Sequence, residues 1–179
     1  FNVVVGDEAG TAITTGDNNV GLGYAALTAT TTGTGNTGIG FSALDANTTA
    51  SDNTGVGANS LGVNTTGTRN TSVGSDSLDA NTEGNDNTAV GKNALSANTT
   101  ASNNTAVGKN SLAVNTTGSD NTAVGKDAGA AVTTAIKNTL IGGLAGDALN
   151  TGSYNVVLGM QALSADTKGA KNVAIGQGA

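Results

Sequence analysis

Residues 87–103 read NTAVGKNALSANTTASN, and residues 104–120 read NTAVGKNSLAVNTTGSD. The same pattern continues in one register from Asn2 to the end of the 179-residue chain, with a period of 17 residues and no insertion. We number the positions of each repeat from 1 to 17. Position 1 is Asn and position 5 is Gly in all eleven repeats, and position 4 is always aliphatic. Residues 2–179 therefore form one domain of ten full repeats and a partial eleventh.

The composition of the repeat selects strands and turns over helices. Glycine at position 5, Gly or Ala at position 15, and Thr and Asn at positions 12–14 leave no helix-forming run of three turns. The run Asn-Thr-Ala-Val-Gly instead suits a short strand, because alternate side chains would face opposite sides before a glycine ends it. We therefore predict an all-β fold, a parallel β-solenoid (β-roll) in which each 17-residue repeat is one coil. Coils stacked at about 4.8 Å would build a rod about 50 Å long.

Two sets of positions are expected inside the solenoid. The position 1 asparagines should form a ladder of stacked amides; its central members are Asn36, Asn53, Asn70, Asn87, Asn104 and Asn121. Positions 4, 8, 9 and 11 are predicted to form the apolar core, with position 4 represented by Val56, Val73, Val90, Val107 and Val124. Position 9 is Leu in seven full repeats and Gly in the other three. Such a thin core leaves an apolar stripe along the rod, so we expect a homotrimer.

The composition argues against several function classes. The chain has no Cys and no His, which removes the usual zinc ligands, thiol nucleophiles and Ser-His-Asp triads. The carboxylate pairs close in sequence, Asp7 with Glu8 and Asp76 with Asp79, have no partner column, so we expect no enzyme, no metal and no cofactor. A net charge of −6 with seven Lys and Arg argues against nucleic acid. No apolar stretch reaches 18 residues, so no membrane-spanning segment is expected.

Candidate contact residues lie at position 6, which varies along the chain. Three consecutive repeats carry Lys92, Lys109 and Lys126 there, and Tyr24 and Phe41 share the column nearer the start. Like charges one coil apart require solvent, so this column should lie on an outer edge. Cations and aromatic rings could hold a glycan or an anionic host-surface receptor there, and the alternative is simply a solvated turn.

Threonine columns offer a second functional hypothesis. Position 13 is Thr in nine of ten repeats and position 14 in eight. These residues suit strands and turns with contacts between neighbouring coils. The alternative is an ice-binding β-solenoid, in which stacked ranks of Thr order water.

The NTAVG units resemble the repeats of phage tail fibres and bacterial surface fibres. They are also similar to the head of YadA-type trimeric autotransporter adhesins, over almost the whole chain. Ala89, Val90 and Gly91, followed by Ala94 or by Ser111 in the next repeat, match the end of the adhesin motif. The resemblance implies a left-handed solenoid in an intertwined or side-by-side homotrimer. It also implies an extracellular, adhesive fibre segment of a virion or cell surface, within a longer fibre. The 17-residue repeat is longer than the adhesin repeat, so we expect an enlarged turn at the Asn-Thr-Thr-Gly stretch.

Overall fold

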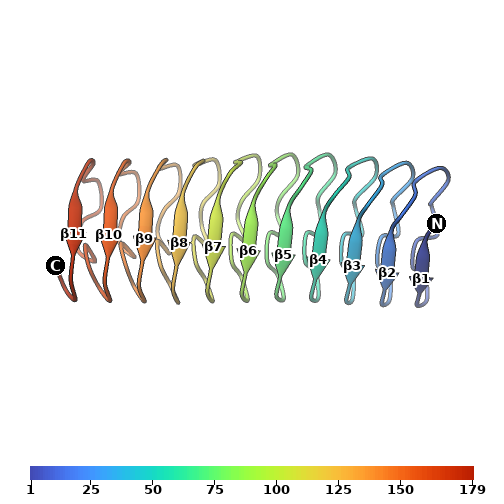
Figure 1. The fold of residues 1–179 in the computed structure, drawn as a ribbon, viewed down its shortest axis with the longest axis horizontal. Helices are drawn as coiled ribbons and strands as arrows, with labels where there is room; N and C mark the ends of the chain where they lie inside the picture. Colours follow the sequence, from blue (N-terminus) through green and yellow to red (C-terminus); the bar gives the residue numbers. More distant parts are fainter.

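The computed structural model describes residues 1–179 and contains one parallel sheet of eleven strands in sequence order, without helices (Figure 1). Each strand has three residues and covers positions 2–4 of a repeat. The strands are β1 (Val3–Val5), β2 (Val20–Leu22), β3 (Thr37–Ile39), β4 (Thr54–Val56), β5 (Thr71–Val73), β6 (Thr88–Val90), β7 (Thr105–Val107), β8 (Thr122–Val124), β9 (Thr139–Ile141), β10 (Val156–Leu158) and β11 (Val173–Ile175).

Each coil pairs with the next in register around most of its circumference. In the sheet, Thr88 of β6 lies opposite Thr105 of β7, one repeat later. Outside the strands, the Leu95 amide donates to the Ser111 carbonyl at 3.0 Å, and the Thr99 amide donates to the Thr116 carbonyl at 3.1 Å. Equivalent bonds between successive turns recur along the rod, so the turns are stacked as well as the sheet. The predicted all-β parallel solenoid with 17-residue coils is confirmed.

The strands turn position 3 inward and positions 2 and 4 outward. Ala89, Ala106 and Ala123 at position 3 are fully buried, whereas Val90 at position 4 is 36% exposed. The core prediction for position 4 was therefore wrong in this chain: Val73, Val90 and Val124 are exposed, and Val56 and Val107 are half-buried. Alternation groups positions 2 and 4 on one side without saying which side faces inward. The inward amide at position 1 puts the small residue at position 3 inside as well.

The other core predictions had mixed outcomes. The prediction that position 9 lies in the core is confirmed, because six of its leucines are fully buried and Leu163 packs against the same cluster. Position 8 is also buried, for example at Ala94. The core prediction for position 11 was wrong, because Val63 and Val114 are 46% and 43% exposed. The interior also contains position 12, which the sequence interpretation placed in a turn. The interior thus consists mainly of positions 1, 3, 8, 9 and 12.

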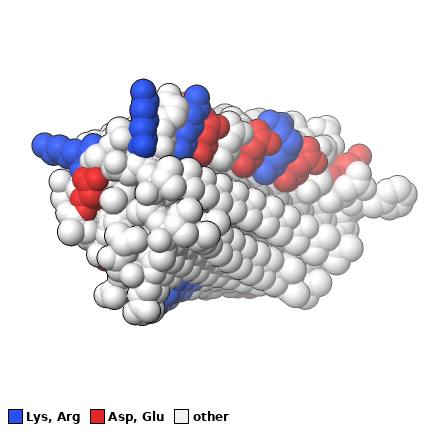
Figure 2. Space-filling view, turned by 60° about the vertical axis from the view of Figure 1, so that its left-hand side comes forward, with Lys and Arg blue, Asp and Glu red and all other residues white.

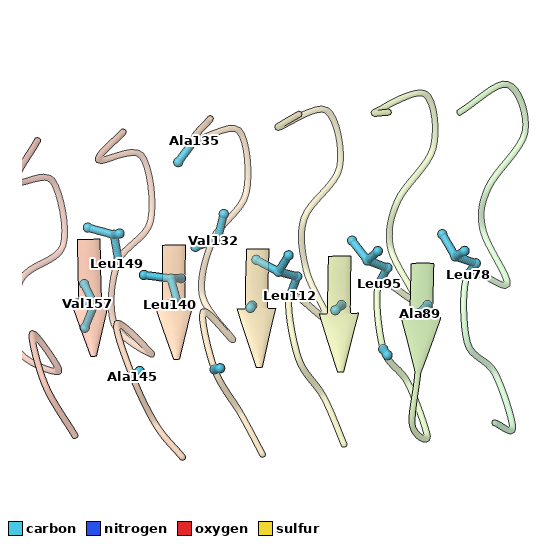
Figure 3. Packing of buried hydrophobic residues seen from close by; sticks show 14 of the residues in the cluster. Leu78, Ala89, Leu95, Leu112, Val132, Ala135, Leu140, Ala145, Leu149 and Val157 are labelled. Carbon is cyan, nitrogen blue, oxygen red and sulfur yellow. The ribbon is translucent and has the colours of Figure 1, made fainter. Parts of the chain in front are cut away.

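Coils with Gly at position 9 fill the missing volume from elsewhere. In the coil of Gly129, position 12 is Val132 rather than Asn, and Leu140 at position 3 of the next coil fills the gap. A Cβ added to Gly129 would lie 2.7 Å from Leu140 Cδ1 and 3.0 Å from Leu112 Cδ2. Figure 3 shows Leu78, Leu95 and Leu112 succeeding one another along the rod before Val132, Leu140 and Leu149 take over.

Glycine in place of leucine at position 9 also relieves backbone strain. Position 9 is left-handed in every complete coil, with φ of 52° at Leu95 and 60° at Gly129. A left-handed non-glycine residue costs about 1–3 kcal/mol, while burying a leucine contributes about 1.5–3 kcal/mol. The two terms are similar, so either residue fits position 9, provided that position 12 or position 3 adjusts its size.

Two asparagine ladders run through the interior. At position 1, the Asn87 side chain donates to Asn70 Oδ1 at 3.1 Å and to the Ala101 carbonyl at 2.8 Å. Its own Oδ1 accepts the Asn104 backbone N–H at 3.0 Å. The predicted amide ladder is confirmed, although it bonds to the backbone as well as to itself. A second, unpredicted ladder occupies position 12 in five coils, comprising Asn47, Asn64, Asn81, Asn98 and Asn115. It stops where Val132 follows, which leaves Asn115 Oδ1 without a partner.

Glycine at position 5 allows the coils to approach closely. These glycines have φ between 121° and 140°, in a region that side chains rarely adopt. At Gly142 (φ 133°), an added Cβ would lie 2.6 Å from the Gly159 carbonyl carbon in the next coil. The invariance of this position therefore has two causes, the backbone conformation and the neighbouring backbone.

Gly142→Ala should destabilise the rod strongly, because backbone strain of about 1–3 kcal/mol adds to the clash with the next coil. Gly143→Ala is a matched control, since its φ is not positive and only the Lys126 carbonyl lies near, at 3.9 Å. We expect thermal unfolding to show a large loss of Tm for the first variant and little change for the second. Equal Tm values would contradict this account of position 5.

Asn87→Asp should destabilise the fold at neutral pH, because a buried carboxylate would replace the amide that donates two hydrogen bonds. The folded state would favour the protonated carboxyl and raise its pKa. The loss should therefore be smallest below about pH 4 and grow as pH rises through the raised pKa. Asn93→Asp is the control, because position 7 of other coils already carries Asp76 and Asp127. A pH-independent loss measured by urea unfolding would contradict the proposed burial effect.

Candidate functional site

The outer surface of the sheet, formed by positions 2 and 4 of all eleven strands, is an uninterrupted uncharged face, here called the sheet face. Its position 4 column is aliphatic throughout, with Leu22 47%, Ile141 37% and Leu158 46% exposed. Its position 2 column has Thr in seven consecutive strands, β3–β9, and Val in the others. No residue at positions 1–5 of any repeat is charged. Figure 2 shows a broad uncharged surface below a row of charged side chains that follows the rod.

Position 6 forms one edge of the sheet face and carries the predicted contact residues. Lys92, Lys109 and Lys126 are all exposed, so the structure agrees with a solvated edge. Tyr24 and Phe41 are 45% and 57% exposed, and their rings stack with centroids 5.3 Å apart. The column therefore contains an aromatic pair and a cationic run. Ala58 and Ser75 separate them, so the two groups do not form one platform.

Acidic and amide side chains at position 7 accompany the lysines. Lys126 lies 3.2 Å from Asp127, and Asn110 donates to Asp127 at 2.8 Å. The Asn110 hydrogen bond lowers the pKa of Asp127, with Lys126 and Lys109 adding to the effect. Hydrogen bonds from Asn59 and Ser75 likewise lower the pKa of Asp76. The cationic run is thus partly neutralised from within its own chain.

The opposite edge of the sheet face is position 17, a charged column that the sequence interpretation missed. Arg69 forms a two-pronged ion pair with Asp86, with Nε and Nη2 donating at 2.7 and 2.9 Å. Further along, the Lys137 Nζ lies 5.5 Å from the Tyr154 ring centroid. The column contains Asp52, Arg69, Asp86, Asn103, Asp120, Lys137, Tyr154 and Lys171. Its variable identities concealed it in the sequence, although the period places every member on one line.

A groove of about 390 Å³ lies on another side of the rod. Asp45 and Asp79 at position 10 line it two coils apart, with Gly62 between them. Burial raises the pKa of both carboxyls, and at Asp79 the nearby Asp76 adds to the effect. Asp79 Oδ1 is buried without a hydrogen-bond partner. The sequence interpretation considered Asp79 with Asp76 but not with Asp45, because only stacking brings position 10 residues together.

The two threonine columns at positions 13 and 14 behave differently. Position 13 hydroxyls stay within the rod: Thr99 Oγ1 donates to the Thr116 carbonyl at 3.2 Å, and Thr116 repeats this with Thr133. Position 14 side chains such as Thr100 and Thr117 are exposed. Hydroxyls at position 13 are thus occupied, so the two neighbouring columns do not form a double rank of free hydroxyls.

The structure contains no cluster of three or more His, Cys, Asp or Glu side chains arranged to hold a metal ion. Nor does the structure contain a helix that could span a lipid bilayer. The recognisable surface features are therefore the sheet face, its two edges and the acidic groove.

Substitution of the two aspartates near the groove should have opposite effects at neutral pH. Asp79→Asn removes a carboxyl whose pKa is raised by burial, so Tm at pH 7 should rise. Asp76→Asn removes a carboxylate that accepts hydrogen bonds from Asn59 and Ser75, so Tm should fall slightly. Both differences should shrink below about pH 4, where the carboxyls become protonated. Changes of the same sign at pH 7 would contradict this assignment.

Comparisons with protein-family models, curated proteins and solved structures found no match for this chain. The resemblance of its NTAVG repeats to fibre and adhesin repeats therefore stays a prediction. The functional argument depends on the geometry of the rod and of its sheet face.

Proposed function

We propose that this chain is a structural and adhesive segment of an extracellular fibre, either a phage tail fibre or a trimeric surface adhesin. In this proposal three copies associate into a rigid rod that supports attachment to a host or surface. The segment has no catalytic role and does not bind nucleic acid. The proposal extends the resemblance of the repeats with the surface geometry of the rod.

The exposed sheet face is the observation that carries this proposal. Isolated soluble proteins rarely expose apolar patches larger than a few hundred Å², and here an aliphatic column continues through all eleven coils. Assembly would cover this column. Val90 and its equivalents then become interface residues rather than core residues. The aliphatic identity of position 4 thus follows from packing between copies.

The regularity of the coils supports the mechanical part of the proposal. At position 1 the Oδ1 of one Asn accepts the backbone N–H of the next Asn along the rod, although the Asn104 Nδ2 has no partner. The in-register sheet repeats at every coil, and no insertion interrupts the rod. A rod of this kind displays the same position at regular intervals. Weak contacts with a glycan or a host-surface receptor could then add up through avidity. The Tyr24–Phe41 pair and the lysine column are the candidate contacts, since both are exposed in the single chain. A lysine that pairs with a neighbouring copy is no longer available to a receptor, so in the assembled rod the aromatic pair is the principal candidate.

One observation favours the second candidate, ice binding. The position 2 threonines from Thr37 to Thr139 form an exposed or half-buried column of seven, in register on the sheet face. This column lies beside the valines of position 4, away from the occupied hydroxyls of position 13. An ice binder would keep the sheet face open to water, whereas a fibre would cover it.

The mass in solution separates the two functions. We expect a species of three times 17.1 kDa by analytical ultracentrifugation at micromolar concentration. The double variant Val90→Asp/Val107→Asp should lose this species, because carboxylates would enter a desolvated interface. Thr100→Asp/Thr117→Asp alters exposed residues of the same two coils outside the sheet face and should retain it. A monomeric wild-type chain would refute the fibre proposal, and thermal hysteresis of that monomer would support ice binding.

A further inference from the structure

The two edges of the sheet face cannot neutralise each other within one chain. At every coil, position 17 precedes the strand and position 6 follows it, with five residues between them. Six steps of extended chain span about 20 Å, far beyond an ion pair. Lys92 and Asp86, for example, lie beside the same strand, β6, on opposite edges of its face.

Association around an axis parallel to the rod would bring the two edges together. In such a cyclic arrangement, each interface joins one edge of a copy to the other edge of its neighbour at equal height. A two-fold axis perpendicular to the rod would instead join like edges. The charge sequences of the two edges can therefore distinguish these arrangements.

At equal height the two edges are complementary. Asp86 would face Lys92 of a second copy, beside β6, and Asp120 would face Lys126, beside β8. Beside β5, Arg69 would face Ser75 with Asp76 next to it. Where position 17 is basic further along, position 6 is uncharged: Lys137 would face Gly143, and Lys171 would face Gln177.

A shift of one coil removes this complementarity. In one direction, Arg69 would face Lys92; in the other, Lys137 would face Lys126. Each shift also retains only one pair of opposite charges between the two columns, with Lys109 as its cation. Only the unshifted arrangement avoids like charges between these columns while keeping two opposite pairs. The charged edges therefore favour one axial alignment of two copies, which the uniform sheet face does not.

Contacts within the chain engage some of these charges but leave their side chains exposed. Asp86 already accepts from Arg69, but both side chains remain exposed, at 42% and 58%. The Asp120 side chain is exposed and forms no ion pair within the chain, and only its backbone N–H is engaged, donating to the Ser102 carbonyl at 3.2 Å. Asp127 would also approach Asp120 of a second copy. It is held against Lys126 at 3.2 Å, with its side chain only 19% exposed.

We propose that a second copy of this chain binds along the sheet face, parallel and without axial shift, through ion pairs between position 17 of one copy and position 6 of the next. The principal pairs are Asp86 with Lys92 and Asp120 with Lys126. The inference rests on the proposed assembly and adds the registration of the copies. The apolar sheet face provides the attraction, and the charged edges select the alignment.

Cross-linking tests the alignment directly, because the chain has no cysteine of its own. Asp120→Cys/Lys126→Cys, treated with a short bis-maleimide, should yield covalent trimers on a denaturing gel. Asp52→Cys/Lys126→Cys, displaced by four coils, is the control and should remain monomeric there. A trimer in solution that gives no covalent trimer, or equal cross-linking by the control, would overturn the alignment and leave the proposed assembly standing. A monomer in solution would overturn both.

Charge reversal tests the pairs themselves. Lys92→Glu/Lys126→Glu should raise the dissociation constant of the assembly about tenfold or more at low salt. The effect should shrink near 1 M salt, where the Debye length is about 3 Å. Adding Asp86→Lys/Asp120→Lys should restore assembly, whereas Lys109→Glu, opposite Asn103, should have a smaller effect. Failure of the fourfold variant to recover would overturn the pairing, provided that its circular dichroism matches the wild type.

Discussion

Stacking of one coil on the next at the spacing of a β-sheet is the constraint on which the rest of the structure depends. At about 4.8 Å between coils, every position has the same position of the next coil as its neighbour. Glycine at position 5 results directly, because any Cβ there would enter the adjacent backbone. The inward amides follow from the same constraint, since an Asn at each coil can both donate to and accept from its neighbours.

Within this spacing the core tolerates exchange between positions. Leucine at position 9 accepts a left-handed backbone to fill the interior, whereas glycine relaxes the backbone and requires volume from position 12 or position 3. The position 12 ladder ends where this exchange occurs, at Asn115 beside Val132. Position 12 can therefore be filled by Asn in one part of the rod and by an apolar residue in another, without a change of period. Each coil needs to match only its two neighbours.

The surface divides according to the same columns. Positions 2 and 4 are uncharged throughout, while positions 6, 7, 10 and 17 carry most of the charged residues. A face without charge, bordered by edges with alternating charge, suits contact with copies of the same rod. Apolar contact between two rods supplies attraction but does not favour one axial alignment over another, because each coil resembles the next. Charged edges can supply that preference, since their identities change from coil to coil.

The period, the parallel solenoid, the position 1 ladder and the leucine column were predictable from the sequence, because each depends on residues that recur every 17 positions. Three features were decided only by the tertiary structure, namely the inward side of the strand, the position 12 ladder and the groove, whereas the charged edge was present in the sequence but not recognised. The strand's inward side could not be read from alternation, so Val90 was assigned to the core although Ala89 lies there. The position 12 ladder and the Asp45–Asp79 groove depend on the path of the turns. The Arg69–Asp86 edge required a column of unlike residues to be seen as one line. Recurrence reveals which residues stack on one another. Which of them face inward is decided only when the coil closes, because alternation along a strand does not say on which side the rest of the coil lies.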